Sequence, residues 1–273
     1  MDSPASRRHH TKDFLRRLGA PEPEPATTPF DPGYDPVTLE SHLEQSGHLM
    51  SGLKISMACW LIADEAATRR KVAAARRIGV ATVTGGGPFE VAATQGMLPE
   101  YLDLCADIGF DRVECGEGFT HLALEPEEIA TMVDQRGLGL EFELGKKHEG
   151  AFDERWVGEL VEQGRQWLGV GARKLIVEGR ESAQGVGLFD DRGDLQVAYA
   201  ERFVDAFGFR DVVFEAPTKA SQFALLKHFG PEVQLANVRL EELLRVEIYR
   251  RGLHSDAFAT APWRADADIA GRV

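Results

Sequence analysis

Three short apolar segments of this sequence each end in a glutamate, at Glu143, Glu178 and Glu215. The first of these glutamates is followed closely by two adjacent lysines, Lys146 and Lys147. A charged side chain at the end of a buried strand costs several kcal/mol to desolvate unless it is paired or used. Because the same ending occurs three times, the pattern predicts one shared polar site, which is typical of an enzyme.

Alternating strand-like and helix-like segments predict how these side chains are positioned. The expected strands cover residues 27–30, 53–56, 81–84, 112–115, 140–144, 174–178, 211–215 and 233–237. Helix-length amphipathic segments lie between most of them, including 90–108, 125–135, 154–168 and 196–207. Eight strands with intervening helices predict an α/β fold, a (β/α)8 TIM barrel whose catalytic groups lie at the carboxyl ends of the strands. An open doubly wound sheet is the alternative, but no Gly-x-Gly-x-x-Gly turn supports it.

We expect a single domain over residues 27–259, with one further segment at each end. Residues 1–26 are polar and rich in proline, so they bury little surface and are predicted to be a disordered, flexible N-terminal arm. Residues 260–273 are predicted to form a loosely held C-terminal tail.

The composition argues against several classes of partner. The 273 residues carry a formal net charge of -13, which disfavours nucleic acid and anionic membranes. No segment approaches the roughly eighteen continuous apolar residues of a membrane span. Cys59, Cys105 and Cys115 show no paired spacing, so we expect neither a disulfide framework nor a zinc site, and we expect a cytoplasmic location. A local cluster of cationic side chains still allows a small anionic substrate.

The sequence resembles the phosphosulfolactate synthase family, whose members are (β/α)8 barrels. The resemblance covers about residues 80–258 and keeps the family's order of motifs. The matching segments are 86–90 with 95–96, 109–114, 143–147, 176–182, 185–190, 214–219 with Gln222, 229–231, 235–237 and 250–253.

The resemblance implies a reaction, the Mg2+-dependent Michael addition of sulfite to phosphoenolpyruvate. Negative charge develops on the carboxylate, and a lysine delivers a proton to the adjacent carbon. By its match to the motif, Lys147 is the expected proton donor, with Lys146 second and Lys54 as a further catalytic candidate. Adjacent lysines on a regular strand cannot both point into one site.

The resemblance also implies residues for the metal and the substrate. The candidate Mg2+ ligands, acting directly or through water, are Glu143, Glu178, Glu215 and Asp31. The candidate substrate-binding residues are Arg180, Lys219, Asn237, Gly86 and Gly87. Alternatives stay open for several of these residues. The glutamates could form structural ion pairs at the barrel rim, Arg180 could bridge neighbouring glutamates, and the glycines could form a plain tight turn.

The departures from the family pattern lie in the first, second and fourth strands. Pro32 stands where the family has a lysine, and Met57, Ala58 and Cys59 stand where the family has small glycines after the second strand. After the fourth strand, residues 116–118 read Gly-Glu-Gly instead of Ser-Asp-Gly. The pattern favours a retained electrophile and metal site with a different nucleophile.

The prediction is therefore a phosphosulfolactate synthase-like lyase that adds a nucleophile, sulfite or another, to phosphoenolpyruvate. We expect small-molecule substrates, no nucleic acid or membrane partner, and a homo-oligomer. The first alternative is a non-catalytic relative that serves as a stress-associated or interaction barrel. The second is a barrel enzyme that stabilises an enolate with Mg2+ but breaks a bond.

Overall fold

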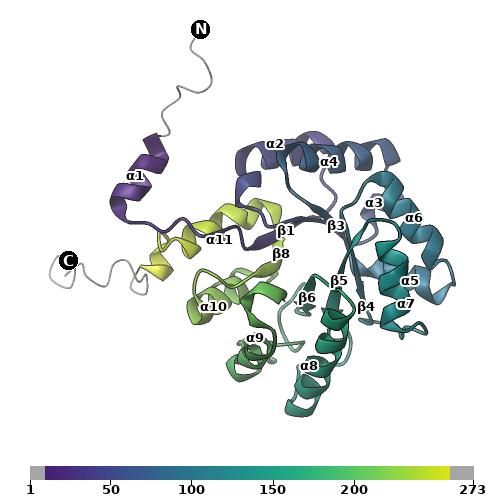
Figure 1. Ribbon diagram of the computed structural model, residues 1–273. Helices are drawn as coiled ribbons and strands as arrows, with labels where there is room; N and C mark the ends of the chain where they lie inside the picture. Colours follow the sequence, from purple (N-terminus) through teal and green to yellow (C-terminus); the bar gives the residue numbers. More distant parts are fainter. Residues whose placement is uncertain (1–9, 259–273) are drawn as a thin grey trace, which may run out of the picture.

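The protein is an eight-stranded parallel barrel in a computed structural model that describes residues 10–258 (Figure 1). The strands are β1 (Thr27–Asp31), β2 (Leu53–Ile55), β3 (Thr82–Thr84), β4 (Arg112–Gly116), β5 (Gly139–Leu144), β6 (Lys174–Val177), β7 (Val212–Glu215) and β8 (Leu235–Arg239). Each strand pairs with the next along the chain, and β8 closes the barrel by pairing with β1. This topology confirms the predicted (β/α)8 barrel and rules out the open doubly wound sheet.

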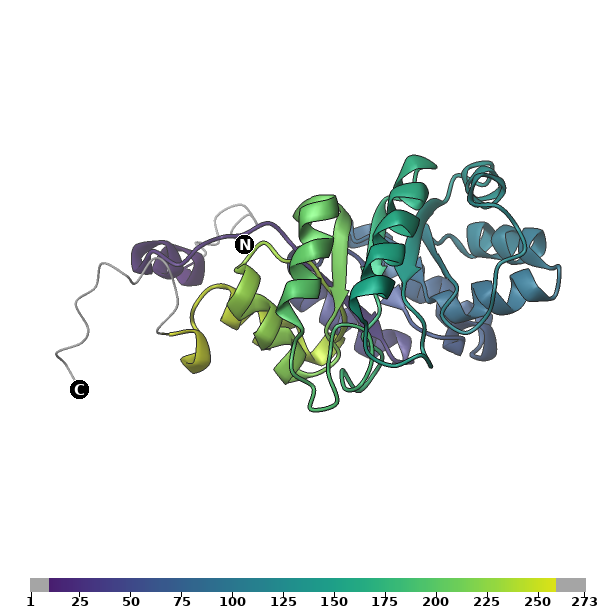
Figure 2. The same cartoon turned by 90° about the horizontal axis from the view of Figure 1, so that it is seen from below.

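Helices cover the outside of the barrel (Figures 1 and 2). They are α2 (Pro36–Ser46), α3 (Cys59–Ile62), α4 (Glu65–Ile78), α5 (Gly86–Thr94), α6 (Leu98–Ile108), α7 (Pro126–Asp134), α8 (Glu154–Gly169), α9 (Val197–Asp211), α10 (Lys219–Phe229) and α11 (Leu243–Arg250), with short 3-10 turns η2 (Gly47–Leu49), η3 (Leu240–Glu242) and η4 (Ser255–Ala257). The prediction of one helix over residues 90–108 was wrong, because the structure has two separate helices there, α5 and α6. Gly96 between them has a φ of 70°, a left-handed conformation that interrupts a helix.

Aspartates fix where several of these helices begin. The Asp64 carboxylate accepts a hydrogen bond from the Ala67 amide at the start of α4, and Asp153 accepts one from Trp156 at the start of α8. These bonds satisfy amide groups that have no partner inside the helix. At the other end of α4, Gly79 adopts a φ of 82° and stops the helix.

Strand β5 shows how the barrel sorts apolar and charged side chains. Phe142 stacks on Trp167 of α8, with ring centroids 4.2 Å apart, so this side of the strand packs under the helices. Glu141 and Glu143 are on the opposite side, because successive side chains of a strand alternate. Glu141 pairs with Arg112 of β4 at 2.8 Å. The apolar core therefore lies between the strands and the helices, and charged groups occupy part of the barrel interior.

The N-terminal segment is partly helical. Within the predicted arm of residues 1–26, the structure forms helix α1 (His10–Leu18), which has no buried residue and stands apart from the helices around the barrel (Figures 1 and 2). The prediction of a disordered arm did not include this helix. Residues 1–9 and the predicted tail, 260–273, lie outside the described residues, and so does residue 259.

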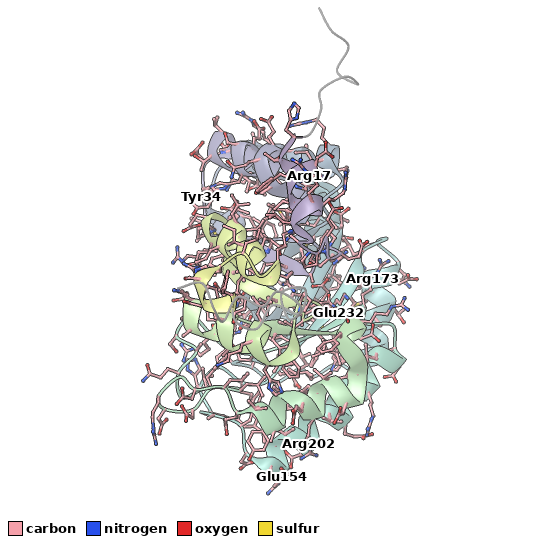
Figure 3. All side chains as sticks on the ribbon, turned by 90° about the vertical axis from the view of Figure 1, so that its left-hand side faces the viewer. Arg17, Tyr34, Glu154, Arg173, Arg202 and Glu232 are labelled. Atoms are coloured by element: carbon pink, nitrogen blue, oxygen red, sulfur yellow. The ribbon has the colours of Figure 1, made fainter. Side chains whose placement is uncertain are left out.

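Ion pairs join neighbouring helices on the outer surface. Glu154 of α8 pairs with Arg202 of α9, and the two residues lie together in Figure 3. Such exposed pairs are worth little individually, so the barrel depends mainly on its buried apolar layer. No helix among residues 10–258 is long and apolar enough to cross a membrane.

Candidate active site

The carboxyl ends of the strands open into a cavity of about 1240 Å³. In barrels of this type, substrate-binding and catalytic groups are found at this end. Most of the site residues predicted from the sequence line the cavity: Lys54, Gly86, Gly87, Glu143, Lys147, Glu178, Arg180, Glu215 and Asn237. The fold thus brings together residues that are up to 183 positions apart, as in the hydrogen bond between Lys54 and Asn237.

Lys147 bridges two of the three predicted glutamates. Its Nζ donates to Glu143 Oε1 at 2.6 Å and to Glu178 Oε2 at 2.7 Å. Glu143 is in β5 and Glu178 follows β6, which pairs with β5, so both carboxylates reach the same point. The Lys147 amide also donates to the Gly118 carbonyl at 2.7 Å. This bond ties the loop after β5 to the loop after β4 and fixes where the lysine enters the cavity.

A second lysine lies deeper in the same site. Lys54 Nζ is 2.7 Å from Glu114 Oε2 and 3.8 Å from Glu215 Oε1. It also donates to Asn237 Oδ1 at 3.2 Å, and the Asn237 amide donates to Glu215. Lys54 is thereby held by β4, β7 and β8 at once. Glu114 was not predicted as a site residue, although an acidic residue inside an expected buried strand would have indicated one.

The site contains more negative than positive charge. Four buried glutamates face two lysines, and this excess appears in the pKa values. Burial and the neighbouring Glu178 carboxylate raise the pKa of Glu143 well above its usual range and that of Glu215 to about 8. Burial also opposes ionisation of Glu178, but the Lys147 ammonium outweighs it and lowers the Glu178 pKa to about 2. A cation or a proton is therefore favoured beside Glu143 and Glu215.

Both lysines are held in their charged form. Burial by itself lowers the pKa of a lysine. For Lys147 the carboxylates of Glu143 and Glu178 outweigh this effect, and the pKa is raised. For Lys54 the carboxylates of Glu114 and Glu215 do the same. Each lysine therefore carries a proton at neutral pH and can donate it to a stronger base.

The backbone is strained at three points around the cavity. Met57, Arg180 and Asn237 have φ values of 50°, 51° and 54°, which side chains other than glycine rarely adopt. Met57 and Arg180 lie in the loops after β2 and β6, Asn237 lies within β8, and all three line the cavity. At Arg180 the strained amide donates to Glu178 Oε1 at 2.6 Å and Glu215 Oε2 at 3.1 Å. Such strain persists where surrounding contacts fix the conformation, and it clusters at functional sites.

The glycine-rich turn after β3 is the beginning of helix α5. The Gly86 amide donates to Glu114 Oε1 at 3.0 Å, so the amide of this predicted substrate-binding residue already has a partner inside the protein. A side chain at Gly85 would lie 2.8 Å from the Met57 backbone nitrogen. The close approach of the two loops therefore requires glycine at this point.

Glu90 is a positioning residue that sequence reasoning missed. It lies on α5 and is 1% exposed. Its carboxylate accepts hydrogen bonds from the amides of Gly118, Phe119 and Thr120, and from the Thr120 hydroxyl at 2.8 Å. One buried acid thus holds the loop after β4 against the cavity. The signal in the sequence was its place at the end of the 86–90 motif.

Two predicted residues lie outside the cavity. Lys146 pairs with the exposed Glu149 at 2.9 Å, and Lys219 pairs with Asp256 at 3.3 Å. Both lysines lie in the loop that follows β5, where the Lys146 side chain is directed to the surface and Lys147 enters the cavity. Lys219 is the first residue of α10 and is about half exposed. Neither side chain contacts the glutamate cluster.

Asp31 is also directed away from the other predicted metal ligands. Its carboxylate pairs with Lys71 of α4 at 2.7 Å and accepts the amides of Gly33 and Tyr34 at 2.8 and 2.6 Å. Its strand neighbour Phe30 lines the cavity, so Asp31 faces the helices on the opposite side of β1. The structure therefore places Asp31 in a buried ion pair and not with the three glutamates.

We expect Asp31→Asn to destabilise the fold without changing the dependence on Mg2+. Breaking a buried ion pair from one side leaves Lys71 unpaired and costs about 3–5 kcal/mol. Urea denaturation measures this loss, and the double variant Asp31→Asn/Lys71→Met is the control, since it removes the stranded charge. A weaker apparent Mg2+ affinity in folded Asp31→Asn would instead return Asp31 to the metal site.

The glutamate cluster fits Mg2+ by donor chemistry and by charge. Carboxylate oxygens are ligands that Mg2+ prefers, and the excess negative charge described above would be balanced by a divalent cation. As the side chains lie, Lys147 occupies the space between Glu143 and Glu178. Within residues 10–258, no three acidic, histidine or cysteine side chains form a ready-made metal site.

The fold and the polar cavity define the class, a (β/α)8 barrel with an acid–lysine site at the carboxyl ends of its strands. The family model described as (2R)-phospho-3-sulfolactate synthase (ComA) matches residues 16–256. The chain belongs to the phosphosulfolactate synthase family, and the match supports an enzyme of that family.

Individual relatives agree with this assignment. The chain is 30% identical over 248 residues to phosphosulfolactate synthase from Methanocaldococcus jannaschii, covering 90% of this chain and 96% of the relative. It is 28% identical over 247 residues to the enzyme of the same name from Methanothermobacter thermautotrophicus, covering 89% and 96%. Among solved structures, the carboxyl transferase domain of Rhizobium etli pyruvate carboxylase superposes with a TM-score of 0.55 at 11% identity, covering 85% of this chain and 44% of that one. That last likeness shows the fold alone.

Proposed function

We propose that this protein is a lyase that catalyses the Mg2+-dependent addition of a sulfur nucleophile to phosphoenolpyruvate, forming a carbon–sulfur bond. The observation that carries the proposal is the Lys147 ammonium held between Glu143 and Glu178 inside the cavity. The relatives named phosphosulfolactate synthase support the same substrate class. In the reaction that the family resemblance implies, the nucleophile is sulfite.

Lys147 is the proton donor in this proposal. When the nucleophile adds to the methylene carbon, the electron pair of the double bond moves to the adjacent carbon and its carboxylate. Lys147 then transfers a proton from Nζ to that carbon, which is a far stronger base than an amine. Glu143 and Glu178 hold Nζ in position before the transfer and stabilise its charged form.

The glutamates are also the residues that would hold Mg2+, namely Glu143, Glu178 and Glu215. When bound, the ion supplies positive charge that stabilises the negative charge developing on the substrate carboxylate. The Glu215 carboxylate is fixed by Asn237 and by the Gly179 amide, which donates to Oε2 at 2.9 Å.

Arg180 is suited to the phosphate or carboxylate of the substrate. It is exposed at the rim of the cavity, and its Nη1 donates to the Lys147 carbonyl at 2.8 Å. A guanidinium can pair with both oxygens of an anion through its planar fork. Asn237 and Lys54 lie deeper and present further polar groups to the same ligand.

We further propose a cytoplasmic location. Cys59, Cys105 and Cys115 are all free thiols in the described chain, as a reducing compartment favours. The expectation of a homo-oligomer stays a prediction.

The test is 31P NMR of the purified protein with Mg2+ and phosphoenolpyruvate, with and without sulfite. A new phosphoester resonance that needs sulfite, protein and Mg2+ together is the expected result. A shifted or broadened phosphoenolpyruvate signal without turnover would keep the electrophile site and call for another nucleophile. No binding at all would contradict the proposal and favour the non-catalytic barrel.

A further inference from the structure

We propose that the nucleophile carries an apolar organic group, and that an apolar lobe of the cavity binds this group. The inference rests on the proposed function and names the class of the second substrate, an alkyl- or aryl-substituted sulfur nucleophile. The lobe is defined by six side chains that line the cavity: Met57, Leu61, Val91, Met97, Leu104 and Phe119.

The lobe and most of the charged cluster are carried by different elements around one cavity. The charged side chains come mainly from β5, β6 and β7 and the loops that follow them. The apolar ones come from the loop after β2, from α3, α5 and α6, and from the loop after β4. A molecule in the lobe therefore lies beside the reacting centre, so the lobe is suited to part of a substrate.

The size of the cavity supports a larger second substrate. Phosphoenolpyruvate and sulfite are both small polar anions. A volume of about 1240 Å³ exceeds the roughly 300–1,000 Å³ of pockets that hold drug-sized ligands. Neither anion gains from contact with thioether, aliphatic or phenyl groups, so the apolar part of the lining has no role in binding them.

The apolar side chains of the lobe are exposed to a degree that favours a ligand. Leu61 is 44% exposed, Val91 53%, and Met97 55%. Several exposed apolar side chains around one cavity favour a bound apolar group, because covering them removes their surface from water. An alkyl or aryl group of a substrate provides that cover.

The walls of the lobe are held in place by contacts with the rest of the site. Glu90 fixes the backbone of Phe119 through its amide at 3.1 Å, and the Phe119 ring lies next to Gly87 at the start of α5. Met57 is held in its strained conformation against Gly85. The lobe is therefore a formed surface in the free protein, which lowers the cost of binding.

The chemical step needs no further reactant. The sulfur anion of a thiolate or a sulfinate adds to the methylene carbon of phosphoenolpyruvate, and one carbon–sulfur bond forms. The π electron pair moves to the adjacent carbon, which takes one proton from Lys147. Solvent returns that proton to the lysine, no bond to phosphate breaks, and nothing is oxidised or reduced.

The test compares sulfite with methanethiol, butanethiol, benzyl mercaptan and butanesulfinate as nucleophiles, with full-length protein, Mg2+ and phosphoenolpyruvate. Product is followed by 31P NMR. We expect kcat/KM to rise about two- to fourfold for each methylene from methyl to butyl, as burial of apolar groups predicts, and to exceed the value for sulfite. The thiol and sulfinate arms show which sulfur nucleophile is used.

Two matched variants test whether the dependence of kcat/KM on chain length comes from the lobe. Leu61→Glu introduces a charge into the lobe and should lower the butyl-to-methyl ratio at least about fivefold, with phosphoenolpyruvate binding retained. Ile248→Glu is the control, because Ile248 is 43% exposed, on α11 and outside the cavity lining. It should leave the ratio unchanged.

Three results would overturn the inference. Sulfite could be the best substrate with no effect of chain length, in which case the proposed function stands and the lobe has another role. Leu61→Glu could dissociate an oligomer in light scattering while the butyl preference persists, which would make the lobe an interface between copies. Absence of phosphoenolpyruvate binding would remove the proposed function itself.

Discussion

Replacing Lys147 with arginine is expected to lower kcat by about 10²–10⁴-fold, the usual contribution of a general acid. Arginine keeps a positive charge between Glu143 and Glu178, so the ion pairs that hold β5 and β6 at the cavity are retained. A guanidinium does not release its proton in a protein, so it cannot protonate the substrate carbon. The variant thus separates the electrostatic role of the residue from its role as an acid.

The measurements are the rate of product formation and the folding of each variant by circular dichroism. Lys147→Ala should lose turnover as well, and it should also be less stable, because two buried carboxylates lose their counter-ion. Lys146→Ala is the matched control: Lys146 is the adjacent lysine, pairs with Glu149 at the surface, and should leave kcat nearly unchanged. A folded Lys147→Arg protein with near-normal kcat would remove Lys147 from the acid role.

Glu178→Gln is expected to weaken the apparent Mg2+ affinity at least about tenfold. The change keeps the shape of the side chain but replaces a carboxylate with a neutral amide, a poorer ligand for a hard cation. Glu178 is the glutamate whose pKa is lowered to about 2, so its carboxylate stays in the ionised form that a metal binds across the whole working pH range. Activity measured against Mg2+ concentration gives the apparent affinity.

Two comparisons make this result specific to the site. Glu149→Gln makes the same chemical change on an exposed acid that pairs with Lys146, and it should leave the Mg2+ dependence unaltered. Calorimetric titration of Mg2+ into Glu178→Gln without substrate tests the metal directly. Unchanged Mg2+ binding in a folded variant would show that Glu178 serves only as the partner of Lys147.

Much of the fold could be predicted because its signals are local. Eight apolar strand segments separated by helix-length segments can be recognised from the spacing of apolar and polar residues alone. The helix boundaries that were predicted wrongly depended on the backbone angles of particular residues. Gly96 adopts a left-handed backbone conformation and separates α5 from α6. The amino-acid composition of this segment does not reveal that conformation.

The site was predicted less completely, because the direction of a side chain depends on the strand that carries it. Glu143 and Glu215 were placed correctly at strand ends that face the cavity. Asp31 also ends a strand, but it lies on the opposite side of β1 and pairs with Lys71. Glu90 was missed because its role depends on amides of a distant loop, which come together only in the folded chain.

The sequence alone determined the barrel class, the polar strand ends and the family, because each follows from residue types in a fixed order along the chain. Tertiary structure decided which of these residues share a cavity. It placed Lys147 between two carboxylates, paired Lys54 of β2 with Glu114 of β4, and formed an apolar lobe in the same cavity. The physical reason is that ion pairing and cavity shape depend on distances of a few ångströms between strands, and those distances are set only when the barrel closes.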